Sequence, residues 1–149
     1  MNTIVNRGIQ YPVGTAVSPT VADFAALVGR VLLVILFLKS GWGKIGGFDQ
    51  TAAMMASKGV PMAELALVVT IVLELGASLL IAIGYKTRWA AIGLALWLVP
   101  VTIMFHAFWA VPADQVMNQT NNFFKNLSIF GGMLMLFAFG PGRYSLDRR

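Results

Sequence analysis

Apolar residues of the 149-residue chain are grouped into four runs that are separated by short, more polar stretches. Each run is close to the ~20 residues that a helix needs to cross the hydrocarbon core of a bilayer. The pattern predicts membrane-spanning helices over residues 22–41, 62–84, 89–109 and 120–140. The predicted fold class is therefore all-α, an integral-membrane four-helix bundle with up-down-up-down topology.

A shorter segment between the first two spans, residues 48–59, has apolar side chains at helical spacing. Phe48, Ala52, Met55 and Ala56 fall on one face of a helix with 3.6 residues per turn. We expect a short amphipathic helix that lies on the membrane or over the mouth of the bundle.

The distribution of Lys and Arg in the loops predicts the orientation of the chain. One side of the predicted bundle carries six of these residues and the other carries two, Lys44 and Lys58. Cytoplasmic loops carry the excess of positive charge, so both termini are expected in the cytoplasm. The predicted organisation is a polar N-terminal segment, a four-span domain and a basic cytoplasmic tail, over residues 1–20, 21–141 and 142–149.

Composition agrees with a membrane protein and narrows its chemistry. Hydrophobic residues make up 58% of the chain and charged residues 11%, against about 25% charged in a soluble domain. The net charge of +5 has no separate polar module to carry it, so we expect the lipid bilayer as partner and no nucleic acid. The absence of cysteine and the single histidine exclude a disulfide scaffold and bis-histidine haem, and no haem, metal or nucleotide is expected.

Two charged residues fall deep inside the predicted spans. Counting ~1.5 Å of helix rise per residue places Arg30 roughly 12 Å and Glu74 roughly 15 Å from the predicted cytoplasmic ends of their spans. Because a charge in the bilayer interior needs a partner, we expect an Arg30–Glu74 ion pair. Two roles are open for the pair, a clamp between helices or a part of a proton or substrate path.

A second polar group is predicted nearer the opposite membrane surface. Lys39, His106 and Lys125 lie at similar counted depths, and Asn122 and Asn126 share a helix face with Lys125. These side chains could line a polar pocket, although a long cationic side chain near a helix end can also extend to the lipid headgroups. His106 has the alternative of being a hydrogen-bonded histidine at the membrane interface.

Three of the four tryptophans lie at the ends of predicted spans, and the fourth does not. Trp42, Trp89 and Trp109 fall at predicted span ends, where amphipathic rings favour the headgroup zone. Trp97 lies deep in the third predicted span.

A family resemblance rests on the order of several short motifs. From Asp23 to Arg149 the chain resembles the DoxX family of small bacterial inner-membrane proteins. The motifs that carry the resemblance are Arg30–Phe37, Gly41-x-x-Lys44-Ile-x-x-Phe48, Gly59-x-Pro61, Glu74, Gly84-Tyr-x-Thr87-Arg88, His106-x-Phe108-Trp109, Phe124-Lys125-Asn126-Leu127 and Gly140-Pro-Gly-Arg143-Tyr-Ser145-Leu-Asp147. The family is similar to the membrane subunit of thiosulfate:quinone oxidoreductase, which implies a multi-pass protein of the bacterial inner membrane and a link to membrane oxidoreductases.

The resulting functional hypothesis is a subunit of a membrane oxidoreductase system that binds a quinone or another small redox ligand. His106 and Glu74 are the candidate catalytic, proton-transferring residues. The candidate ligand-binding residues are Lys125, Asn126, Asn122, Lys39, Lys44 and Trp109. The electron donor is expected on a partner subunit. The alternatives are a small ion or solute transporter or channel, which would form a homo-oligomer, and a non-catalytic membrane scaffold.

Overall fold

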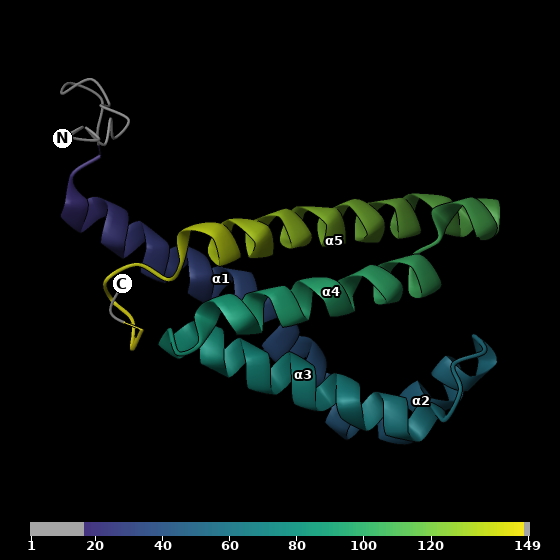
Figure 1. Ribbon diagram of the computed structural model, residues 1–149. Coiled ribbons are helices and arrows are strands. Elements are labelled where there is room, and N and C mark those ends of the chain that lie inside the picture. The colour runs from purple at the N-terminus through teal and green to yellow at the C-terminus, as the bar shows by residue number, and fades with distance from the viewer. Residues whose placement is uncertain (1–16, 148–149) are drawn as a thin grey trace, which may run out of the picture.

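Helices account for all the regular structure within residues 17–147, the part of the chain that the computed structural model describes (Figure 1). Four segments, α1, α3, α4 with η1, and α5, are long and apolar enough to cross a membrane. The all-α class and the four predicted spans are thus confirmed. The elements are α1 (Pro19–Gly46), α2 (Phe48–Ser57), α3 (Ala63–Ile83), α4 (Thr87–Phe105), the 3-10 helix η1 (Phe108–Ala110) and α5 (Ala113–Phe139).

The helix ends differ from the predicted span ends where polar residues continue a helix. α1 begins at Pro19, after Ser18 accepts a hydrogen bond from the Val21 backbone N–H, and it runs on to Gly46. α5 begins at Ala113, because residues 113–119, four of which are polar, are still helical. The hydropathy pattern identifies only the apolar section of a helix. The backbone hydrogen bonds continue into the polar residues beyond that section, so the helix is longer than the predicted span.

The predicted short helix between the first two spans is confirmed as α2. Its buried residues Ala52 and Met55 pack against Leu67 of α3. Gly59 has a φ of +80°, the left-handed conformation that glycine adopts without strain, and it turns the chain toward α3. α2 therefore lies against the bundle rather than apart from it.

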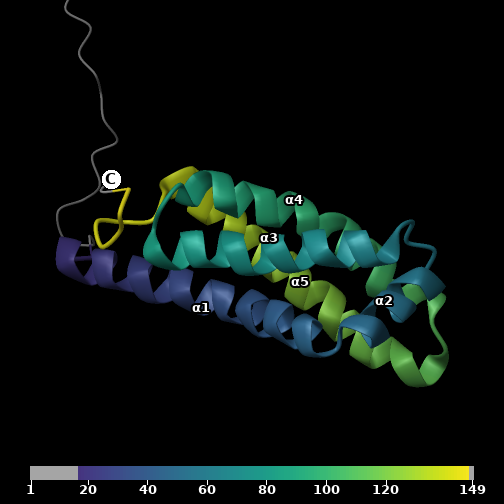
Figure 2. The same cartoon turned by 90° about the horizontal axis from the view of Figure 1, so that it is seen from below.

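The four long helices run along a common direction (Figures 1 and 2). α3 packs between α1 and α4, and α4 packs against α5. α1 meets α5 at Gly132, where an added Cβ would lie 3.0 Å from Leu33 Cδ1. From this crossing toward α2 the two helices separate (Figure 1). A continuous apolar core, which includes Val34, Leu94 and Met133, fills the bundle around the crossing.

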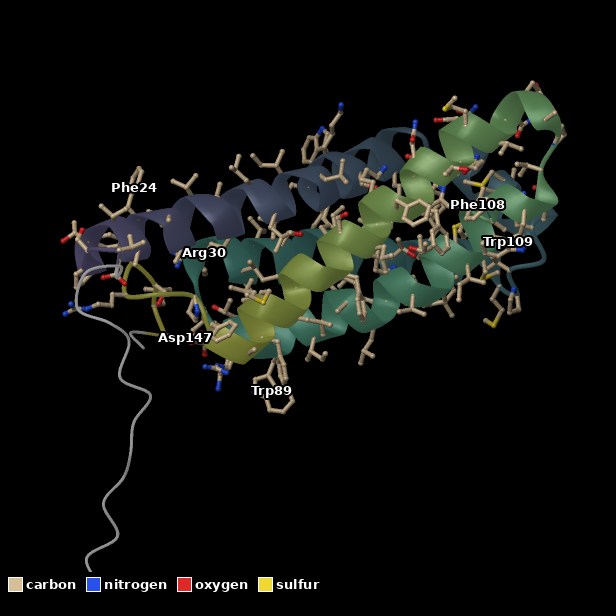
Figure 3. All side chains as sticks on the ribbon, turned by 90° about the horizontal axis from the view of Figure 1, so that it is seen from above. Phe24, Arg30, Trp89, Phe108, Trp109 and Asp147 are labelled. Atoms are coloured by element: carbon tan, nitrogen blue, oxygen red, sulfur yellow. The ribbon has the colours of Figure 1, made fainter. Side chains whose placement is uncertain are left out.

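The end of the bundle that contains residues 17 and 147 is called the terminal end, and the end that contains α2 and η1 is called the α2 end. Figure 3 shows Arg30 and Asp147 toward the terminal end, with Phe108 and Trp109 toward the α2 end. Both described chain ends lie on one side of the bundle, as an even number of spans requires. The cytoplasmic location of that side stays a prediction.

Residues 140–147, which we call the C-terminal clasp, fold back onto the terminal end. The Leu146 N–H donates to the Ile83 carbonyl (3.3 Å), and the Asp147 N–H donates to the Gly84 carbonyl (2.8 Å). The Asp147 carboxylate accepts hydrogen bonds from the backbone N–H groups of Lys86 and Thr87, both at 2.9 Å. This carboxylate satisfies the free N–H groups at the start of α4. The described part of the predicted basic tail is therefore packed structure, and residues 1–16, 148 and 149 lie outside the described chain.

Candidate functional site

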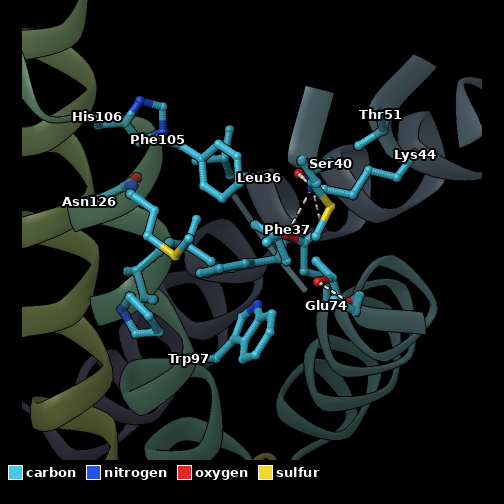
Figure 4. A pocket seen from close by; sticks show the side chains of 18 of the residues that line it. Leu36, Phe37, Ser40, Lys44, Thr51, Glu74, Trp97, Phe105, His106 and Asn126 are labelled. Atoms are coloured by element: carbon cyan, nitrogen blue, oxygen red, sulfur yellow. Dashed lines mark hydrogen bonds and ion pairs between the residues drawn. The ribbon is translucent and has the colours of Figure 1, made fainter. Parts of the chain in front are cut away.

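A cavity of about 480 Å³ occupies the half of the bundle nearest α2 (Figure 4). It lies where α1 and α5 have separated, and α1, α2, α3, α4 and α5 all contribute to its wall. Most of the wall is apolar, with Phe37, Met55 and Phe105 among its larger side chains. The polar residues that line it are Ser40, Lys44, Thr51, Thr70, Glu74, Trp97, His106, Lys125 and Asn126.

An ion pair between Lys44 of α1 and Glu74 of α3 forms part of the wall. Lys44 Nζ lies 2.9 Å from both carboxylate oxygens of Glu74 and also donates to the Ser40 hydroxyl. The Glu74 side chain is 8% exposed and the Lys44 side chain 23%. All three ammonium hydrogens have acceptors, which a buried ion pair needs if it is to offset the loss of hydration.

Close packing of α1 on α3 brings these two residues together. An added Cβ at Gly41 would lie 2.8 Å from Leu75 Cγ and 3.4 Å from Glu74 Cβ. Only a residue without a side chain allows the helices to approach this closely. The contact at Gly41 thereby fixes how α1 is positioned along α3. In this position Lys44, one turn after Gly41, reaches Glu74.

The predicted Arg30–Glu74 ion pair is wrong. Arg30 is buried at the terminal end, where its guanidinium donates to the carbonyls of Ala82 (3.3 Å), Pro141 (2.6 Å) and Tyr144. The depth count assumed that the two spans begin at the same level. α1 in fact extends well beyond the end of α3, so Arg30 is level with the last turn of α3, and Glu74 is level with Gly41.

His106 and Asn126 lie on the α4–α5 side of the cavity. His106 ends α4, and its Nδ1 is 2.9 Å from Oε1 of Gln119. Asn126 is buried, and its amide donates to the Thr102 hydroxyl at 3.0 Å. These bonds join α4 to α5 and hold both side chains in place. A smaller apolar groove of about 180 Å³ between the same helices shares Asn126 with the cavity.

Lys125 reaches the cavity from the exposed face of α5. Its Nζ donates to Asn122 Oδ1 at 2.7 Å, which agrees with the prediction that the two residues share a helix face. Asn122 itself does not line the cavity.

Lys39 and Trp109 also lie outside the cavity wall. Lys39 is exposed on α1. It lies five positions before Lys44, which places the two side chains about 140° apart around the helix. Trp109 is 60% exposed and packs edge-on against Phe108 and Phe123, with ring centroids 5.0 and 5.7 Å away. This aromatic group fixes η1 at the α2 end.

Trp97 is a cavity residue that the functional hypothesis omitted. Its indole Nε1 is buried and has no hydrogen-bond partner among the described residues. The sequence carried a signal for it, because it is the one tryptophan deep inside a predicted span.

The titratable side chains of the wall do not form a metal site. Within residues 17–147, no three His, Asp or Glu side chains come together in an arrangement that could hold an ion. The cavity instead combines apolar surface, a neutralised ion pair, an imidazole and several hydrogen-bond donors. Such a wall suits an uncharged, largely apolar molecule that carries a few polar atoms.

Relatives of the chain include proteins of bacteria and eukaryotes. Inner membrane protein YphA of Escherichia coli is 39% identical over 123 residues, which cover 83% of this chain and 88% of the relative. Inner membrane protein YqjF of the same organism is 42% identical over 126 residues, 85% of this chain and 92% of the relative. The surfeit locus protein 4 homolog of Schizosaccharomyces pombe is 31% identical over 125 residues, 83% of this chain and 36% of that longer protein.

No solved structure matches the chain. The DoxX family matches residues 25–107, a range that contains Lys44, Glu74, Trp97 and His106. The family match and the two inner-membrane relatives agree with the four membrane-spanning helices of the fold. The chain is an inner-membrane protein and belongs to the DoxX family.

Proposed function

We propose that the protein binds a quinone in the cavity between α1 and α5, as the membrane subunit of an oxidoreductase system. The observation that supports this most is the cavity itself, a largely apolar space within a membrane bundle whose ion pair carries no net charge. Its volume of about 480 Å³ falls in the ~300–1,000 Å³ range of small-molecule sites. A quinone head group is an uncharged ring with two carbonyl oxygens, and its tail is soluble in lipid.

The position of the cavity favours a ligand that arrives through the bilayer. The cavity is partly open, and two residues of its wall, Leu36 of α1 and Met104 of α4, are 39% and 40% exposed. A lipid-soluble ring would enter through this opening from the side of the bundle.

Two side chains of the wall can exchange protons with a bound ligand. Reduction of a quinone takes up two electrons and two protons. An imidazole ring can both accept and donate a proton, so His106 is suited to proton transfer. Glu74 is the carboxylate in the cavity wall, and Lys44 holds it in a fixed position. The electrons are assigned to a partner subunit of the oxidoreductase system.

Thermal unfolding in the presence of quinone tests the binding site. The purified protein in phospholipid nanodiscs should unfold at a higher temperature when decylubiquinone or a short-chain menaquinone is added, because a ligand that binds the folded state stabilises it. Ala66→Phe adds a ring to the cavity wall and should abolish the shift. Val69→Phe adds the same ring to the exposed face of α3 and should preserve it.

The proposal is wrong if wild-type protein shows no quinone-dependent shift and carries no quinone through purification. A shift of equal size in wild type and Ala66→Phe would mean that quinone binds elsewhere on the protein.

A further inference from the structure

The polar side chains of the cavity wall differ in whether they have a hydrogen-bond or ion-pair partner. Lys44 is paired with Glu74, Lys125 with Asn122, and His106 with Gln119. Trp97 Nε1 is buried and has no partner among the described residues. Two other buried polar atoms in residues 17–147 share this property, the hydroxyl oxygens of Ser78 and Thr87, and neither residue lines the cavity.

The indole ring of Trp97 forms part of the cavity wall, and its nitrogen has almost no accessible surface. Figure 4 shows the nitrogen on the edge of the ring that points toward Phe37. An indole N–H can only donate a hydrogen bond. A buried donor that lacks an acceptor lowers the stability of a protein, and a ligand that supplies the acceptor removes that penalty.

We infer that Trp97 binds the ligand by donating its indole hydrogen to a carbonyl oxygen of the ring. This inference rests on the proposed quinone site. It adds that the site recognises a hydrogen-bond acceptor atom on an uncharged ring. The charges of Lys44 and Glu74 cancel each other, and Lys125 and His106 are already hydrogen-bonded to amide side chains, so these groups contribute less to this recognition than the indole does. Trp97 acts as a binding residue and takes no part in proton or electron transfer.

A matched pair of ligands separates hydrogen bonding from apolar contact. 2-Methyl-1,4-naphthoquinone and 2-methylnaphthalene have the same ring frame and differ in the two carbonyl oxygens. Their dissociation constants are measured for the full chain in nanodiscs, as wild type, Trp97→Phe and Trp89→Phe. Phenylalanine keeps an aromatic ring and removes the N–H. Trp89 is 74% exposed at the start of α4, which makes Trp89→Phe a control for the exchange of tryptophan by phenylalanine.

Trp97→Phe should weaken naphthoquinone binding about fivefold, the usual size of one hydrogen bond, and leave methylnaphthalene binding unchanged. Trp89→Phe should change neither. Equal weakening of both ligands by Trp97→Phe would show that the side chain contributes only packing, and unchanged naphthoquinone binding would show that it contributes nothing. Either result overturns the inference while the proposed function stands. Failure of the wild type to bind the quinone overturns both.

A second measurement needs no change at Trp97. The chain has four tryptophans, so ¹⁵N-tryptophan labelling gives four indole N–H signals, and single Phe variants at Trp42, Trp89 and Trp109 assign the fourth by elimination. Naphthoquinone should shift the Trp97 signal downfield in wild-type protein, and methylnaphthalene should not. A Trp97 signal that responds equally to both ligands contradicts a hydrogen bond to the carbonyl.

Discussion

The two ends of the bundle are held together in different ways. At the terminal end, Arg30 and Asp147 bond to backbone groups and join the helices to the C-terminal clasp. At the α2 end, the Lys44–Glu74 ion pair joins α1 to α3 beside an open cavity. The terminal end uses long-range bonds to carbonyls and N–H groups that close the spaces between helices. The α2 end uses bonds between side chains and leaves α1 and α5 apart. One end of the molecule is built for stability, and the other has room for a ligand.

The two ends also differ in what a substitution can change. A backbone carbonyl is present whatever the residue, so losing Arg30 leaves three carbonyls without this donor, one of them buried and two partly buried. At the α2 end, both members of the ion pair are side chains and can be replaced together. This difference predicts which variants lose stability and which lose binding.

Arg30→Ala should cause the largest loss of stability. It removes the donor from three carbonyls and should lower the free energy of unfolding by about 3 kcal/mol or more, with reduced protein abundance in the membrane. Unfolding by SDS titration and immunoblotting of membranes measure both effects. Arg143→Ala, at an exposed residue of the same clasp, is the control. Wild-type abundance and unfolding of Arg30→Ala would show that the terminal end does not depend on this residue.

Substitutions of the ion pair should show strong coupling. Lys44→Met and Glu74→Gln should each cost about 2–3 kcal/mol, since Lys44→Met leaves the Glu74 carboxylate unpaired and Glu74→Gln does the same to the Lys44 ammonium. The double variant should recover most of the loss, and a double-mutant cycle in the unfolding free energy measures the coupling. Additive losses would mean that the two residues do not interact in the folded protein.

Asp147→Ala should have a moderate effect confined to the terminal end. It removes the carboxylate that accepts from the first N–H groups of α4, and loss of such a cap costs about 1 kcal/mol. Quinone binding at the other end should be unchanged. A variant that unfolds normally but loses quinone binding would show that the two ends are coupled.

Lys39→Gln should have the smallest effect, within about 0.5 kcal/mol in stability and with wild-type quinone affinity. Lys39 is exposed and lies outside the cavity, in contrast to Lys44. Parallel binding measurements on Lys39→Gln and wild type check this. Weaker quinone binding in Lys39→Gln would place this side chain in the site after all.

The sequence predicted those features that depend on residues close together in the chain. Apolar runs long enough to cross a bilayer identified the four spans, and helical spacing identified α2. His106 and Lys125 were grouped because their counted depths agreed, and Asn126 because it shares a helix face with Lys125. All three line the cavity.

Features that depend on the relative level and rotation of helices could not be predicted. The Arg30–Glu74 prediction failed because the depth count began at span ends, and α1 extends beyond α3. Lys39 was grouped with the cavity residues because its counted depth matched theirs. The grouping failed because a depth count does not give the direction in which a side chain points. The close approach at Gly41, which pairs Lys44 with Glu74, requires the packed structure.

The acceptors of the Arg30 guanidinium have a consequence for biosynthesis. Tyr144 is 114 positions further along the chain than Arg30, so at about 5–20 residues per second its synthesis follows on the order of 10 s later. When the first span enters the membrane during this interval, its arginine has neither the Pro141 nor the Tyr144 carbonyl. Water, lipid headgroups or the insertion machinery must solvate the cation until translation reaches the clasp, and completion of the terminal end is therefore a late step in the maturation of the protein.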